Sequence, residues 1–73
     1  MPKTQKQTIK TLGKKIQKLR QAQGVSQEKF AAQLNISRTY MGFIEQGREN
    51  PSLKLLMKIA RRLNVKVEEL FQR

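Results

Sequence analysis

The stretch that most constrains the fold is residues 27–46, QEKFAAQLNISRTYMGFIEQ, which predicts two short helices joined by a tight turn. Ser26 and Ser37 are suited to cap the two helices, because a serine hydroxyl accepts hydrogen bonds from the unpaired amides of a first helical turn. Asn35 lies between the helices, and asparagine tolerates the left-handed conformation better than any residue except glycine. The connection therefore spans only about three residues, which makes the two helices cross steeply.

Charge and composition narrow the possible functions. Sixteen Lys and Arg residues oppose five Asp and Glu residues, which gives a formal net charge of +11 and a pI near 10.8. This excess favours a polyanionic partner, most simply nucleic acid, although a basic surface that only aids solubility is the alternative. The sequence contains no His and no Cys, so the usual general base and the commonest metal ligands are missing. We therefore expect neither enzymatic activity, nor a metal, nor a cofactor.

The 73 residues are enough for one small domain. Residues 1–7 are polar and basic and predict a disordered arm, which is either a frayed terminus or, through Lys3 and Lys6, an arm along a DNA backbone or minor groove. Residues 8–73 form the predicted domain. No apolar run approaches the roughly 20 residues of a membrane span, and no secretory signal follows the N-terminus. We expect a cytoplasmic protein without membrane contact.

Apolar periodicity predicts three supporting helices, so the expected fold is all-α with five helices. The first covers residues 8–23, ends at Gly24 and buries Ile9, Leu12, Ile16 and Leu19. The fourth follows Pro51 and a Ser52 cap, and we expect its apolar face to be Leu53, Leu56, Met57, Ile59, Ala60 and Leu63. The fifth, over residues 67–72, presents Val67, Leu70 and Phe71. Lys66 stands at its capping position, which predicts fraying. Phe71 is expected in the core, with a dimer seam as the alternative.

Residues 27–46 resemble the helix-turn-helix of the phage repressor and Cro family, also called the XRE family. Ala31 matches the family's small inner residue, Asn35 its turn residue, and Met41 and Ile44 its aliphatic positions. The similarity covers roughly residues 9–71, including the segments 25–28, 44–51 and 64–71. Controller proteins of restriction-modification systems look similar in the same stretch. The resemblance implies a compact, five-helix, lambda-repressor-like DNA-binding domain.

The second helix of the motif, about residues 37–46, is the expected recognition helix in the major groove. Periodicity directs Met41 and Ile44 to the core and leaves one outward set: Arg38, Thr39, Gly42 and Phe43. Arginine can bind guanine bidentately and threonine can contact a thymine methyl, and the resemblance implies that Arg-Thr-Tyr at residues 38–40 contacts DNA. The predicted base contacts are Arg38, Thr39, Tyr40 and Phe43. Phe43 departs from the family pattern, and it either packs on a thymine methyl or folds back into the core.

The predicted phosphate contacts are Gln27, Ser37, Arg48 and Asn50. Gln27 opens a helix, and the free amides of a helix N-terminus bind anions. Arg48 and Asn50 follow the recognition helix, where the resemblance implies contact with the DNA backbone. For Asn50 the alternative is turn chemistry before Pro51.

Two charged residues suggest a structural ion pair. Arg20 flanks the apolar stripe of its helix, where a charge either extends to solvent or pairs with a buried acid. Glu45 belongs to the recognition helix, where phosphates would repel an outward carboxylate, so we expect it to turn inward. The resemblance implies that Glu45 pairs with Arg20.

These observations predict a transcriptional regulator that binds double-stranded DNA sequence-specifically, as a homodimer on a palindromic operator. No small-molecule ligand is evident. The alternative is an antitoxin-type protein-interaction module that also regulates its own promoter. A basic membrane-surface binder is disfavoured by the interrupted, capped helices, and an RNA-binding role is disfavoured by the groove-sized recognition helix.

Overall fold

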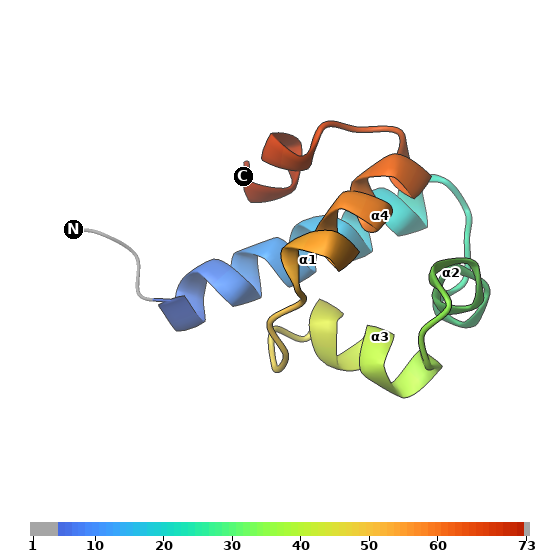
Figure 1. The fold of residues 1–73 in the computed structure, drawn as a ribbon, viewed down its shortest axis with the longest axis horizontal. Coiled ribbons are helices and arrows are strands. Elements are labelled where there is room, and N and C mark those ends of the chain that lie inside the picture. The colour runs from blue at the N-terminus through green and yellow to red at the C-terminus, as the bar shows by residue number, and fades with distance from the viewer. Residues whose placement is uncertain (1–4, 73) are drawn as a thin grey trace.

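The computed structural model describes residues 5–72, which form four α-helices and a final 3-10 helix. In chain order the elements are α1 (Gln5–Ala22), α2 (Gln27–Leu34), α3 (Arg38–Glu45), α4 (Leu53–Leu63) and η1 (Val67–Phe71). In Figure 1, α1 runs through the middle of the molecule, with α3 on one side of it and η1 on the other. The fold is all-α as predicted, but the fifth helix is a short 3-10 helix.

Serine side chains start three of the four α-helices. The hydroxyls of Ser26, Ser37 and Ser52 accept hydrogen bonds from the backbone amides three residues later, at 3.0, 3.0 and 3.1 Å. Each serine has extended backbone angles, as an N-cap requires. The three predicted caps are confirmed.

All four α-helices end at a residue in the left-handed conformation, and these residues are Gly24, Asn35, Gly47 and Asn64. Backbone amides just beyond each end bond back to carbonyls of the last turn, which satisfies groups that the helix leaves free. Glycine and asparagine are the residues that accept this conformation at least cost. The short connections between the helices follow from these four exits.

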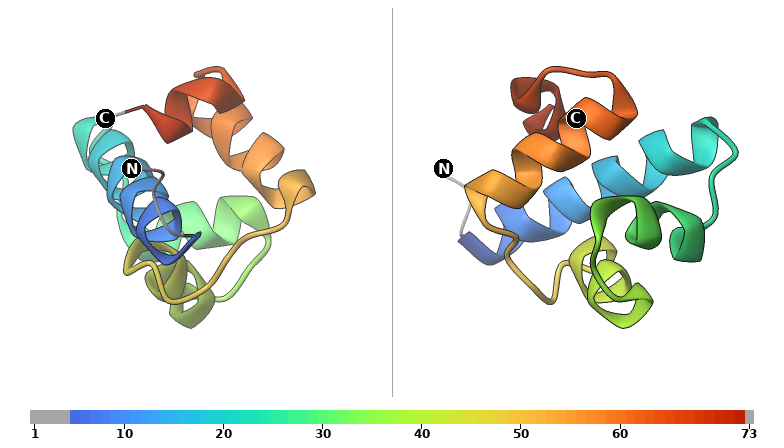
Figure 2. Two further views of the ribbon diagram at one scale, coloured as in Figure 1. Left: turned by 90° about the vertical axis from the view of Figure 1, so that its left-hand side faces the viewer. Right: turned by 45° about the vertical axis from the view of Figure 1, so that its right-hand side comes forward.

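One hydrophobic core joins all five elements, as the ring of helices in Figure 2 indicates. Its most buried large side chains are Phe30, Ile16, Leu34, Met41, Ile44, Ile59, Leu63 and Leu70.

In α4 the inward face is rotated from the predicted one. Leu55 is buried, whereas Leu53 and Met57 are 67% and 51% exposed. The prediction that these last two residues face inward is therefore wrong.

Both ends of the described chain differ from expectation. Helix α1 begins at Gln5, so the last three residues of the predicted arm (5–7) are helical, while residues 1–4, with Lys3, lie outside the described residues. At the other end, Lys66 has the angles of an N-cap but makes no capping side-chain bond. Leu70 is fully buried and Phe71 is 47% exposed, so the core placement of Phe71 is wrong. The 3-10 turn explains this, because residues 67 and 70 eclipse each other at three residues per turn and residue 71 points elsewhere.

Helix α1 crosses the end of α3 at very short range. A Cβ on the buried Gly13 would lie 2.7 Å from the carbonyl oxygen of Glu45 and closer still to that of Ile44. A Cβ on Gly47 would lie 2.7 Å from the Cα of Lys10. Two glycines therefore allow the backbones of α1 and α3 to touch, and this contact fixes where α3 sits.

Between residues 5 and 72, no helix is both long and apolar enough to cross a membrane.

Candidate nucleic-acid interface

Helices α2 and α3 form the predicted two-helix motif. Asn35 has φ 61° and ψ 41°, and the amide of Ile36 bonds to the carbonyl of Ala31 at 3.0 Å. Ala31 is 1% exposed and lies in the core at the foot of this turn. Lys58 of α4 donates a hydrogen bond to the carbonyl oxygen of Leu34 at 3.1 Å and so supports the end of α2. The turn geometry and the small buried residue hold α3 at the surface.

Helix α3 has a buried side and a side directed to solvent. Met41 and Ile44 are fully buried, as predicted. Arg38 and Thr39 are exposed, while Tyr40 and Phe43 are half-buried. Tyr40 packs against the core, whereas Phe43 is not among the residues that do so within the described chain. The alternative in which Phe43 folds back into the core is therefore not the one that the structure adopts.

Gly42 was expected to face outward, and this prediction is wrong because the side chain of Gln27 covers it. A Cβ on Gly42 would lie 3.6 Å from the Gln27 side-chain oxygen, at ordinary contact distance. The amide nitrogen of Gln27 donates to Oε1 of Glu45 at 3.0 Å. Gln27 therefore ties the start of α2 to the end of α3 across the glycine. Sequence reasoning missed this link, although a glycine within a short helix was the available signal.

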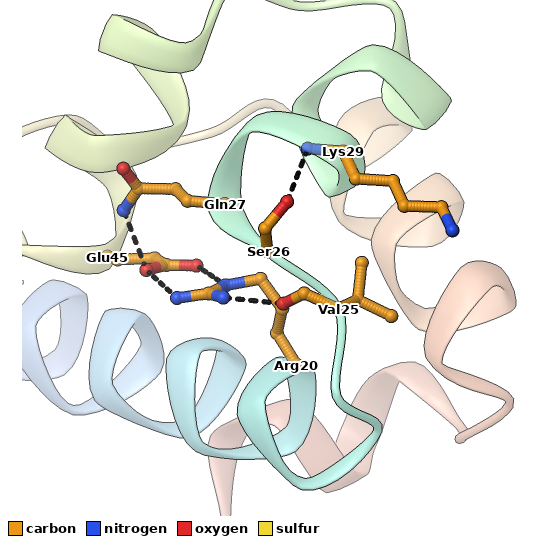
Figure 3. Close-up of polar contacts among 6 residues, drawn as sticks. All are labelled: Arg20, Val25, Ser26, Gln27, Lys29 and Glu45. Carbon is orange, nitrogen blue, oxygen red and sulfur yellow. Dashed lines mark hydrogen bonds and ion pairs between the residues drawn. The ribbon is translucent and has the colours of Figure 1, made fainter.

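Arg20 and Glu45 form a buried, two-pronged ion pair between α1 and α3 (Figure 3). Arg20 Nε lies 2.7 Å from Glu45 Oε2, and Arg20 Nη2 lies 3.1 Å from Oε1. The third guanidinium nitrogen, Nη1, donates to the carbonyl oxygen of Val25 at 2.7 Å. The two side chains are 8% and 1% exposed. The two residues named from the sequence are thus each other's partner.

This pairing determines the charge on the outer side of α3. Glu45 is the only acidic residue in the helix, and its carboxylate is turned inward and held by Arg20 and Gln27. Arg38 remains exposed at the first turn. The solvent side of α3 therefore carries positive charge and no negative charge, which suits a polyanion.

A second exposed cation, Arg48, lies just after the C-terminal end of α3, which we call the exit of α3. The guanidinium carbon of Arg48 lies 4.5 Å from the centroid of the Phe43 ring. Arg48 Nη1 also donates to Oε1 of Gln46 at 3.4 Å. Asn50 is exposed two residues further on, and Pro51 after it is buried.

The predicted site residues thus occupy one continuous part of the fold. Ser37, Arg38 and Thr39 lie at the start of α3, and Phe43 and Arg48 lie at its exit. Gln27 lies beside the middle of α3. Tyr40 is the least available of the proposed base contacts, because it packs against the core.

Comparison with known proteins agrees with this arrangement. The helix-turn-helix family model HTH_3 matches residues 16–70. The control protein C.MunI of a Mycoplasma species is 47% identical over 60 residues, covering 81% of each chain. The crystal structure of the restriction-modification controller protein C.AhdI from Aeromonas hydrophila superposes with a TM-score of 0.82 at 36% identity, covering 86% of this chain and 96% of that one.

A further solved structure is that of SinR, a master regulator for biofilm formation, in complex with DNA. It superposes with a TM-score of 0.75 at 30% identity, covering 81% of this chain and 95% of that one. These relatives are regulators rather than enzymes.

Proposed function

Because the chain belongs to the HTH_3 helix-turn-helix family of transcriptional regulators, we propose that it binds double-stranded DNA sequence-specifically, with α3 in the major groove. The observation that carries this proposal is the solvent side of α3. It presents Arg38 and Thr39 while the helix's one acid is buried against Arg20. SinR, whose fold is similar, was solved in complex with DNA.

Base contacts come from the first turns of α3. The Arg38 guanidinium reaches the O6 and N7 acceptors of a guanine, and Thr39 contacts a neighbouring base through its hydroxyl or methyl group. Both side chains are exposed on a helix whose opposite face is fully packed, so the helix presents them rigidly. Tyr40 contributes only its phenolic hydroxyl, because the side chain packs on the core.

Phosphate contacts flank the reading helix on two sides and set its register. On one side is the start of α2, where the free main-chain amides of the helix and the Gln27 side chain contact DNA phosphates. The hydroxyl of Ser37 accepts from the Tyr40 amide and keeps its own hydrogen available for a phosphate oxygen. On the other side are Arg48 and Asn50, both exposed after α3.

Two copies of the chain bind a symmetric site in this proposal, with half-sites about one helical turn apart. The contact between the copies must leave α2 and α3 free for DNA. A different side offers exposed apolar surface, since Met57 is 51% exposed and, together with Val65 and Val67, lines a hollow of about 310 Å³ between α4 and η1. We place the contact between the two copies at this hollow.

Selection of bound duplexes from a random pool tests the proposal. The protein should enrich a sequence with twofold symmetry, because each copy reads one half-site. Enrichment of an asymmetric sequence would contradict the homodimer but not sequence-specific DNA binding. Failure to enrich any sequence at moderate salt, where binding through phosphates alone persists, would overturn the regulator function.

A further inference from the structure

The four α-helices end in one motif, but the residue that closes the motif differs at α3. In each case the amide of the residue that follows the left-handed residue bonds to the carbonyl five residues earlier, in the last part of the helix. At the ends of α1, α2 and α4 that amide belongs to an apolar residue packed against the core, namely Val25, Ile36 and Val65. At the end of α3 it belongs to Arg48, whose amide bonds to the Phe43 carbonyl at 2.8 Å.

The apolar contact that accompanies such a helix end is replaced at α3 by a cation on an aromatic ring. The Arg48 guanidinium lies 4.5 Å from the centroid of the Phe43 ring, within the range of a cation–π interaction. The same two residues are joined through their backbones and their side chains. A single helix exit thus ties the cation to the ring.

The path of the chain into Arg48 is also fixed. Gly47 has φ 74°, and its amide bonds to the Ile44 carbonyl at 3.1 Å. Helix α1 packs directly against this glycine, because a Cβ there would lie 2.7 Å from the Cα of Lys10. Gln46 accepts a further bond from the Arg48 guanidinium. Arg48 is exposed, yet its backbone and its side chain are both constrained.

We infer that Phe43 is a positioning residue, which acts by holding the Arg48 guanidinium at the exit of α3 and not by reading a base. This inference rests on the proposed function, in which Arg48 contacts a phosphate. An exposed arginine has many rotamers, and fixing them before binding reduces the entropy lost when the contact forms. The half-buried ring of Phe43 supplies that restraint, and this role accounts for a large aromatic side chain outside the core.

The restraint is measurable without DNA. In the free protein, the side-chain protons of Arg48 should be shifted upfield in NMR spectra by the ring current of Phe43. The shift should persist in Phe43→Tyr and disappear in Phe43→Leu. Because Phe43 is outside the core, Phe43→Leu should keep the wild-type fold, and the spectra themselves show whether it does. Unshifted Arg48 protons in the wild-type protein would overturn the inference directly.

A double-mutant cycle on a selected duplex tests the consequence for binding. Phe43→Leu should weaken binding about two- to fivefold, the effect of losing an exposed cation–π contact. The loss of affinity should be the same factor for every duplex tested. In an Arg48→Ala background Phe43→Leu should have no further effect, and Phe43→Tyr should bind like the wild type. Arg62→Ala, which removes an exposed cation from α4, is the matched charge control.

Two results would contradict the inference. Phe43→Leu could weaken binding as much without Arg48 as with it, or it could alter the preference at one base pair, as a base contact would. Failure of the wild-type protein to select any sequence would contradict the proposed function instead. The NMR measurement would still decide whether Phe43 holds Arg48.

Discussion

Replacing Glu45 by alanine should destabilise the fold severely, because it would leave the Arg20 guanidinium buried with one remaining acceptor. Arg20 now donates to both carboxylate oxygens of Glu45 and to the carbonyl of Val25. Its side chain is only 8% exposed, so water cannot replace the lost carboxylate without opening the structure. The substitution also leaves the Gln27 amide without its Glu45 partner.

The expected cost is about 3–5 kcal/mol, the range for removing one partner of a buried ion pair. A domain of this length has a total stability of about 4–11 kcal/mol. Because about 1 kcal/mol shifts the melting temperature of such a domain by about 4–8 °C, the melting temperature should fall by at least about 12 °C. Glu45→Gln keeps the shape and one acceptor, and it should cost less than Glu45→Ala.

The assay is thermal and urea unfolding followed by circular dichroism, on Glu45→Ala and on Glu45→Met, Arg20→Met and their double variant. Each single variant should be strongly destabilised. The double variant should be much more stable than the sum of the two losses predicts, because neither charge is left buried alone. A melting temperature unchanged in Glu45→Ala, or losses that add within about 0.5 kcal/mol, would refute the claim that this pair sustains the fold.

Three further substitutions test other parts of the account. Gly13→Ala should destabilise by about 1–3 kcal/mol in urea unfolding, because its Cβ would press on backbone carbonyls of α3; a gain in stability, as helix propensity alone predicts, would contradict the close crossing. Lys66→Ser should stabilise by about 0.5–1 kcal/mol by supplying the missing N-cap, and an unchanged midpoint would count against it. Met57→Lys should shift the sedimentation coefficient towards a monomer, whereas Gln33→Lys, at an exposed position of α2, should not; equal behaviour of the two variants would reject the hollow between α4 and η1 as the contact.

The sequence predicted the features that depend on a few neighbouring residues. The caps at Ser26, Ser37 and Ser52 and the left-handed exits at Asn35 and Gly47 follow from local backbone chemistry, and all five are present. Two sequence features suggested the pairing of Arg20 with Glu45, together with the family resemblance. Arg20 is a cation beside an apolar stripe, and Glu45 is an acid on a helix expected to lie against DNA phosphates.

The features that depend on how the helices pack were harder to predict. In α4, leucines at 53, 55 and 56 fit more than one helical face, and only packing selects the rotation that buries Leu55 and exposes Leu53. The covering of Gly42 by Gln27 likewise requires α2 and α3 to be placed relative to each other. Phe71 was misplaced because an α-helical period was assumed where the chain forms a 3-10 helix.

Whether the exposed side of α3 reads DNA sequence is tested most directly by comparing selections from one random duplex pool. Wild-type protein should enrich a twofold-symmetric sequence. Arg38→Ala should lose its preference at one base pair per half-site, a loss of about 1–3 kcal/mol of discrimination, whereas Arg48→Ala should weaken binding to all sequences and reduce its salt dependence. If Arg38→Ala enriches the same sequence as the wild type with the same discrimination, α3 does not read that base through Arg38 and the account is contradicted.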